Sequence, residues 1–256
     1  MGILNVTPDS FYDGGQYKNT AAILGQVQNM TEAGATFIDI GGYSSRPGAH
    51  DISVKEELER VLPIIEAILK EFPDTLISID TFRSEVAKCA IDAGACLIND
   101  ISAGHLDQHM LETVAQLGVP YIMMHMKGTP QNMAQQTNYD DIIKDILFYF
   151  SDRIAEARRL GIVDLIVDPG FGFAKTVEQN YELLNKLELL KMTNLPILAG
   201  ISRKSMIYKT LNNSAKEALN GTTVLNTIAL QKGTAILRVH DVKEAMECIT
   251  LTQQLH

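Results

Sequence analysis

The sequence has few basic residues, three cysteines and no long apolar run, and each scarcity argues against a class of protein. Its 22 lysines and arginines are outnumbered by 31 acidic residues, which gives a formal net charge of −9 at pH 7. A protein that binds the nucleic-acid backbone depends on a basic surface, so we expect no nucleic-acid partner. No apolar stretch approaches the roughly 18 residues needed to cross a bilayer, and we expect no membrane span.

The three cysteines, Cys89, Cys96 and Cys248, show no spacing typical of metal ligands. No basic and then apolar signal segment precedes the first strand-like run, so we expect reduced thiols and a cytoplasmic protein. The chain has no linker rich in glycine, serine or proline and no charge block that would divide it. Its 256 residues therefore predict one domain over residues 1–256, a size typical of a single α/β barrel.

Short apolar runs alternate with segments of helical periodicity along the whole chain. Eight such runs lie at 2–5, 36–41, 75–80, 95–100, 119–125, 163–169, 196–201 and 234–240. Between them, segments such as 53–72 and 139–160 repeat apolar residues every three or four positions, as helices do. Nearly continuous apolar runs are typical of parallel strands, for which right-handed crossovers allow a closed barrel or an open doubly wound sheet. Eight units favour the (β/α)8 TIM barrel, an α/β fold.

Polar residues recur at the carboxyl ends of these runs, where a barrel places its active site. In order, the ends give Asn5, Asp39, Asp80, Asn99 with Asp100, His125, Asp168, Ser202 to Lys204, and Arg238 with His240. Any one of them could simply end an apolar run at solvent. Their recurrence at every strand end predicts a ligand site in a concave mouth.

The charges at these ends indicate the kind of ligand. Asp80, Asn99 and Asp168 suit a planar heterocycle with a guanidine-like edge, because a carboxylate can accept two hydrogen bonds from such an edge. The predicted cations at the same mouth, which suggest an anion, are Arg46, Arg203, Lys204, Arg238 and His240. Asp241 and Glu244 occupy the pattern of an N-cap and N3 residue, so a helix amino terminus suited to a phosphate is predicted beside them.

Eight sequence blocks, in order along the chain, resemble the dihydropteroate synthase family. They are "MGILNVTPDSFYDGG" (1–15), "DIGGYSSRPGA" (39–49), "SIDTFRSEVA" (78–87), "INDISAG" (98–104), "MHMKGTPQNM" (124–133), "DPGFGFAKT" (168–176), "GISRKSMI" (200–207) and "ILRVHDV" (236–242). A single block would be unspecific, but their order and spacing span the whole chain. The resemblance implies an enzyme that joins p-aminobenzoate to a dihydropterin methyl diphosphate, releases pyrophosphate and forms dihydropteroate for folate synthesis. It also implies that Mg²⁺ assists the leaving group.

The resemblance further implies which residues bind each part of the substrates. Those around the pterin would be Asp80, Asn99, Asp168, Lys204, Arg238 stacking on the ring, and Ile122, Met124, Phe173 and Gly200 beside it. Asn5, Arg46 and His240 would surround the diphosphate, with Asn5 as the protein ligand of magnesium. The p-aminobenzoate pocket, which sulfonamides would share, would be closed by Asp9, Phe11, Asp13, Ser45, Arg46, Pro47 and Ser205. The candidate catalytic residues in these sets are Asp9, Phe11, Asp13, Arg46, Lys204 and His240.

Two positions depart from the family pattern, which usually has Glu or Gln at Tyr43 and often Thr at Ser45. We expect the loop energetics to differ, but not the reaction. The resemblance implies a dissociative substitution that needs no strong protein nucleophile, and none is evident at the strand ends. It also implies a homodimer.

Two alternatives are a pterin-binding barrel that passes methyl groups to corrinoids and a non-catalytic pterin-binding paralogue. The blocks "NVTPDSF", "SSRPG" and "SRKS" resemble the synthase loops and disfavour the first. The second should have lost a loop or a diphosphate ligand, and it is disfavoured because the chain retains Asn5, Arg46, Lys204, Arg238 and His240.

Overall fold

The structure, a computed structural model, describes residues 1–6, 16–45 and 51–255. Strands and helices alternate through the described residues. The strands are β1 (Gly2–Asn5), β2 (Phe37–Gly41), β3 (Leu76–Asp80), β4 (Leu97–Asp100), β5 (Tyr121–Met124), β6 (Leu165–Asp168), β7 (Leu198–Ala199) and β8 (Ile236–Leu237). The α-helices are α1 (Gln16–Glu32), α2 (Val54–Glu71), α3 (Ser84–Asp92), α4 (Met110–Leu117), α5 (Ile142–Arg159), α6 (Val177–Asn185), α7 (Ser205–Thr210), α8 (Leu219–Gln231) and α9 (Val242–Thr252). Short 3₁₀ helices are η2 (Met133–Gln135), η3 (Leu187–Thr193), η4 (Ala215–Glu217) and η5 (Gln253–Leu255).

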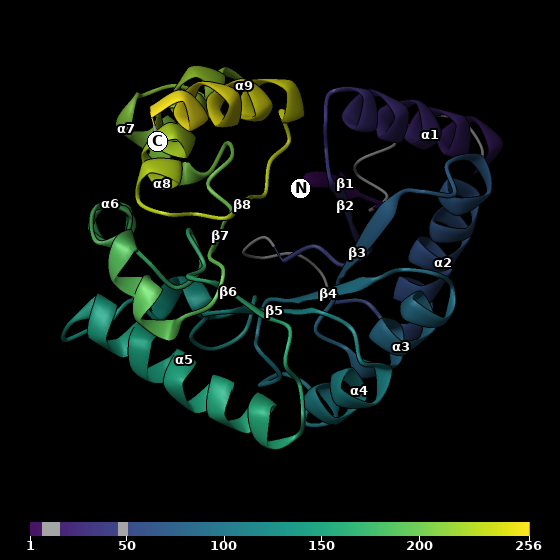
Figure 1. The fold of residues 1–256 in the computed structure, drawn as a ribbon, viewed down its shortest axis with the longest axis horizontal. Coiled ribbons are helices and arrows are strands. Elements are labelled where there is room, and N and C mark those ends of the chain that lie inside the picture. Colours follow the sequence, from purple (N-terminus) through teal and green to yellow (C-terminus); the bar gives the residue numbers. More distant parts are fainter. Residues whose placement is uncertain (7–15, 46–50, 256) are drawn as a thin grey trace.

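The eight strands close into a parallel barrel. Strands β1 to β6 pair in sequence order, and β7 pairs with β8. Parallel bridges Val167↔Ile197 and Gly2↔Val239 join the two groups, and the amide of Ile3 donates to the carbonyl of Val239 at 2.9 Å. The helices form a ring outside the strands (Figure 1). The predicted (β/α)8 barrel is therefore confirmed, and each predicted apolar run contains one of the observed strands.

The outer helices form where an apolar stripe and a cap occur together. In α5, the Asp141 side chain accepts hydrogen bonds from the amides of Ile143 and Lys144, which would otherwise lack helical partners. Ile146 and Phe150, four residues apart, are both fully buried on one face of this helix. That face packs against the outside of the barrel, and the mouth forms at the ends of the strands.

Side chains that point into the barrel change from apolar to polar along the strands. Leu97, Ile122 and Leu198 form a buried apolar cluster inside it. Two residues further along β4, the next inward position is Asn99, because successive side chains alternate between the two faces of a strand. The polar mouth therefore stands on an apolar floor. Among the described residues, no helix combines the length and the apolar character that a membrane span requires.

Candidate active site at the barrel mouth

An arginine bridges two carboxylates in the interior of the barrel. Arg238, which directly follows β8, donates from Nε to Asp39 Oδ2 and from Nη2 to Asp80 Oδ2, each at 2.6 Å. Asp39 is fully buried, and the side chains of Asp80 and Arg238 are 17% and 19% exposed. The bridge joins β2, β3 and β8, and it fixes the plane of the guanidinium just below the opening.

A second pair of opposite charges lies beside Gly200. A Cβ atom placed on Gly200 would be 3.9 Å from Lys204 Nζ and 4.0 Å from Asp168 Oδ2, so both groups surround this glycine. Asp168 Oδ1 accepts from the amide of Gly170 at 2.8 Å, which orients the carboxylate. Lys204 Nζ donates to the carbonyl of Phe171 and lies 4.7 Å from the centre of the Phe173 ring. A ligand here would meet an acceptor and a donor side by side.

Burial shifts the pKa values of these groups, and it brings those of Asp80 and Lys204 close to neutral pH. It raises the pKa of Asp80 to about 7, against the opposing effect of Arg238. Burial also lowers the pKa of Lys204 to about 8, although the negative charge of Asp168 opposes the shift. The pKa of Asp168 is raised in the same way, with Lys204 acting against burial. Because each shift comes from lost solvation, a polar ligand that restores hydrogen bonds would favour the charged forms.

The remaining described candidates surround this centre. Met124 is buried in a cluster with Phe173 packed against it, and Ile122 belongs to the apolar floor. Ser205, the first residue of α7, is half-buried. His240 Nδ1 lies 3.1 Å from Ser202 Oγ, and this contact orients the imidazole in the segment that follows β8. The structure thus brings these residues to one end of the barrel, but their assignment to substrates remains a prediction.

The first two loops carry several predicted residues, and five of these lie outside the described residues: Asp9, Phe11, Asp13, Arg46 and Pro47. Ser45 is described and is half-buried. Tyr43 is buried, and its hydroxyl accepts a hydrogen bond from Gln131 Nε2 at 2.8 Å. Its ring packs edge-on against the Phe82 ring, with 5.0 Å between the ring centroids. This departure from the family pattern therefore connects the base of the second loop to the segments after β3 and β5.

The structure corrects the prediction that Arg203 is an anion-binding cation, and it confirms that Asp241 precedes a helix. Arg203 donates to both carboxylate oxygens of Asp241 at 2.8 Å, so its charge is already paired. Asp241 does stand at the N-cap position of α9, but its side chain makes no capping hydrogen bond. The local pattern suited a cap, and the bidentate ion pair between distant segments prevails because it satisfies two charged groups at once.

Three further residues that were predicted at strand ends are held by partners within the protein, although Asp100 does end β4 and His125 directly follows β5. Asp39 lies in the middle of β2, two residues before Gly41. Asp100 accepts from the Tyr121 hydroxyl at 2.6 Å and from the amides of Ser102 and Gly104, so it holds the loop after β4. His125 is buried, with Nδ1 3.0 Å from Lys175 Nζ.

Lys175 is a buried residue that the sequence did not single out. Its Nζ donates to the carbonyls of Gly170 and Phe173, both at 3.0 Å, and contacts His125 Nδ1. These acceptors match the three donors of an ammonium group. Lys175 therefore stabilises the loop that carries Phe173 and Gly170, and the amide of Gly170 orients Asp168. A lysine within a glycine-rich loop gives no sequence signal that distinguishes this stabilising role from exposure to solvent.

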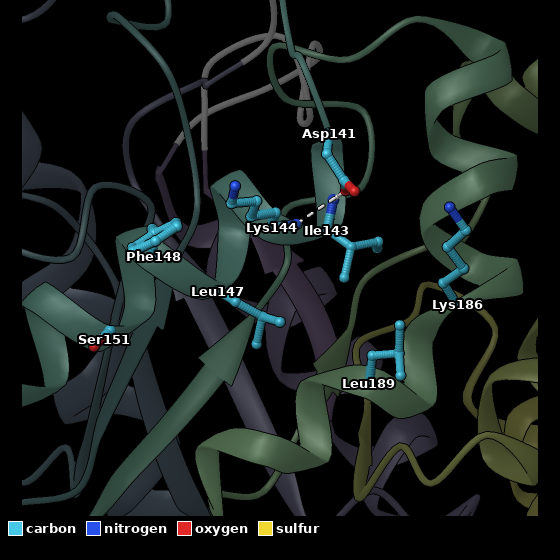
Figure 2. Close-up of a pocket in the computed structure, with 8 residues that line it drawn as sticks. All are labelled: Asp141, Ile143, Lys144, Leu147, Phe148, Ser151, Lys186 and Leu189. Atoms are coloured by element: carbon cyan, nitrogen blue, oxygen red, sulfur yellow. Dashed lines mark hydrogen bonds between the residues drawn. The ribbon is translucent and has the colours of Figure 1, made fainter.

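A separate concave surface lies on the outer ring of helices. Figure 2 shows its lining residues, which come from α5, its cap and the segment around η3: Asp141, Ile143, Lys144, Leu147, Phe148, Ser151, Lys186 and Leu189. Asp141 is occupied by its hydrogen bonds to the start of α5. The paired carboxylates and cations lie in the barrel mouth instead, which makes the mouth the candidate active site.

Comparison with known proteins identifies the family of this chain. The family model described as "Pterin binding enzyme" matches residues 1–240. A dihydropteroate synthase of Synechocystis sp. is 48% identical over 249 residues, which cover 96% of this chain and 86% of that protein. The Yersinia pestis enzyme in a sulfonamide complex has a TM-score of 0.93 at 44% identity and covers 99% of this chain and 92% of its own. The Xanthomonas albilineans enzyme in complex with 7,8-dihydropteroate has a TM-score of 0.89 at 36% identity, covering 99% and 92%. The chain therefore belongs to the pterin-binding enzymes and, within them, to the dihydropteroate synthase family.

Proposed function

We propose that the barrel mouth joins p-aminobenzoate to (7,8-dihydropterin-6-yl)methyl diphosphate and releases pyrophosphate and 7,8-dihydropteroate. The observation that carries this proposal is the convergence of Asp168 and Lys204 around Gly200, beside the Arg238 bridge. A pterin presents adjacent donors and acceptors on one planar edge, which these groups can match. The relatives complexed with a sulfonamide and with 7,8-dihydropteroate support the same ligands for this chain.

The pterin would occupy the interior, and the reacting methylene would face the opening. Asp80, Asn99 and Asp168 would accept from or donate to the ring edge, and Lys204 would donate to it. Arg238 would place its guanidinium against the ring, beside the apolar surface of Met124 and Phe173. Ile122 would pack beside the ring, and Gly200 would leave space for it because glycine has no side chain.

The reaction would exchange one bond at the methylene carbon for another. The bond from carbon to the diphosphate oxygen breaks, and its electron pair leaves with pyrophosphate. The aniline nitrogen then forms the new bond to carbon and loses a proton. Arg46 and His240 would offset the charge that develops on the diphosphate, and the p-aminobenzoate would lie against Ser45 and Ser205 with the first two loops.

The residues at the mouth fit Mg²⁺ as a cofactor with one protein ligand. Asn5 ends β1 at the mouth, is half-buried and offers a side-chain amide oxygen. The described part of the chain contains no cluster of three or more histidine, cysteine or acidic residues that could hold a metal. Magnesium commonly keeps several waters and binds substrate phosphates, so a single protein oxygen is sufficient. When bound, the ion would supply positive charge beside the diphosphate.

We also propose a cytoplasmic homodimer. Large exposed apolar side chains at the end of α7 and on α8 and α9 support the dimer: Leu211, Val224 and Leu251 are 52%, 50% and 70% exposed. Light scattering of the purified protein tests the stoichiometry, and a monomer at micromolar concentration would contradict it.

A pyrophosphate-release assay tests the proposed reaction. Release should require both the pterin diphosphate and p-aminobenzoate, and the pterin product should contain the aniline. Binding of the pterin without release under these conditions would favour the non-catalytic paralogue.

A further inference from the structure

A buried carboxylate lies directly beneath the groups assigned to the pterin. Asp39 is fully buried in the middle of β2 and is the register partner of Ser78 on β3. Side chains alternate along a strand, so Asp39 and Gly41 share the inward face, and Gly41 is nearer the mouth. Asp39 therefore acts on a ligand through its neighbours.

One oxygen of Asp39 links strands that are distant in sequence. Asp39 Oδ2 accepts from Asn99 Nδ2 at 3.1 Å and from Arg238 Nε at 2.6 Å, which connects β2 with β4 and β8. Among the described residues, Asp39 Oδ1 has no hydrogen-bond partner. A buried carboxylate is costly unless its neighbours use it, and the two neighbours that use this one both face the ligand space.

We propose that Asp39 is a positioning residue for pterin recognition, which orients the amide of Asn99 and the guanidinium of Arg238. The proposal deepens the proposed function and rests on it. On this proposal, Asp39 determines which donors and acceptors Asn99 and Arg238 present to the pterin ring.

The Asn99 amide has two orientations of almost the same shape, which exchange its oxygen and nitrogen. Asp39 selects between them, because an amide oxygen turned toward the carboxylate would place two acceptors together. Nδ2 therefore stays on Asp39, and the Asn99 oxygen remains free of that contact and able to accept from a ligand N–H. A site built around such an acceptor discriminates against rings that lack the donor.

The Arg238 guanidinium is held at two of its nitrogens. Asp39 accepts from Nε and Asp80 accepts from Nη2. Because the guanidinium is planar, these two hydrogen bonds together fix the orientation of its plane. Without Asp39, the guanidinium keeps only its Nη2 anchor. Its face would then be presented to the ring in a fraction of the population, which weakens stacking.

Asp39 also influences the charge of Asp80. The charges that act on Asp80 are those of Arg238, which lowers its pKa, and of Asp39, Glu57 and Asp100, which raise it. The ammonium group of Lys204 also interacts with the Asp80 carboxylate. Removal of the Asp39 charge should therefore move the pKa of Asp80 below its value of about 7. A role that was only structural would leave this titration in place.

The test compares Asp39→Asn and Asp39→Ala with the control Ser78→Ala. Ser78 is fully buried in the same layer, and its hydroxyl has no hydrogen-bond partner among the described residues. We measure binding of 7,8-dihydropterin by calorimetry from pH 5.5 to pH 9 and the steady-state KM for both substrates. Asp39→Asn should weaken pterin binding about tenfold at pH 8, and Asp39→Ala should weaken it further. Ser78→Ala should leave the affinity within about twofold of the unchanged protein.

Two further readouts separate positioning from loss of folding. The pH midpoint of pterin binding should move to lower pH in Asp39→Asn, and KM should rise for the pterin substrate but stay constant for p-aminobenzoate. A partly unfolded sample would lower only the number of active sites and leave both KM values unchanged. If the unchanged protein binds the pterin and Asp39→Asn keeps its affinity and midpoint, the positioning role is wrong. If the unchanged protein binds no pterin, the proposed function falls as well.

Discussion

Replacement of Asp168 by asparagine should weaken pterin binding by about 2 kcal/mol or more, roughly 30-fold. Asp168 Oδ1 is committed to the amide of Gly170 at 2.8 Å, so Oδ2 is the oxygen that faces Gly200 and the ligand space. In the variant, the amide oxygen must take the position at Gly170, and the NH₂ group replaces Oδ2. A donor then faces the donor edge of the pterin. The expected loss equals one charge-assisted hydrogen bond, which contributes about 1.5–3 kcal/mol.

Titration calorimetry with 7,8-dihydropterin measures this loss, and Asp164→Asn is its matched control. Asp164 is exposed and immediately precedes the same strand, β6, at the opposite end of the barrel. The Asp168 variant should remain folded, because burial already disfavours the charge of this carboxylate and raises its pKa. Equal pterin affinities for the unchanged protein, Asp164→Asn and Asp168→Asn would refute the assignment of Asp168.

Three further predictions concern the loops. Sulfonamides should compete with p-aminobenzoate, so that saturating p-aminobenzoate restores the initial rate; undiminished inhibition would exclude a shared pocket. Arg46→Ala should lower turnover roughly a hundredfold but change affinity for the bare pterin by at most about threefold, since its charge acts on the diphosphate. Near-normal turnover would make Arg46 only a surface charge. Tyr43→Phe should lower the free energy of unfolding by about 1 kcal/mol through loss of the Gln131 bond, with turnover unchanged; denaturant titration and kinetics on one sample test both parts.

The barrel could be predicted because its strands are buried on both faces and read as continuous apolar runs. Even the shortest strands, β7 and β8, fall inside predicted runs at 196–201 and 234–240. The ends of those runs were less informative, because an apolar run does not reveal where the last inward side chain stands. Asp39 and Asp80 looked equivalent in sequence, but the register places Asp39 opposite Ser78 and Asp80 opposite Gly41, nearer the mouth.

Polar partners that are distant in sequence were beyond the reach of local patterns. Arg203 and Asp241 each fitted a local function, as a cation at the mouth and as a helix cap, but the fold pairs them with each other. The Lys175 contact with His125 spans fifty residues and leaves no periodic signal. Arg238 was expected to stack on the ring, and the structure adds two carboxylate anchors that only closure of the barrel could bring to it.

The pKa values of Asp80 and Lys204 predict a narrow pH window for pterin binding to the free protein. Binding needs Asp80 ionised, above about pH 7, and Lys204 protonated, below about pH 8. Affinity should therefore fall on both sides of pH 7–8, with proton release on binding at pH 6 and proton uptake at pH 9.

The stability of the free protein should change in the opposite sense. The raised pKa of Asp80 contributes stability at low pH that is lost as the pH rises through about 7. The lowered pKa of Lys204 contributes stability above its unfolded pKa that is lost as the pH falls through about 8. These two groups thus destabilise the free protein most at pH 7–8, the range in which the pterin binds best. In this range both groups are charged and buried, and hydrogen bonds from a ligand would compensate for their lost solvation. Calorimetry in buffers of different ionisation enthalpy measures the exchanged protons, and a flat affinity profile with no proton exchange from pH 6 to pH 9 would contradict this assignment of the two groups.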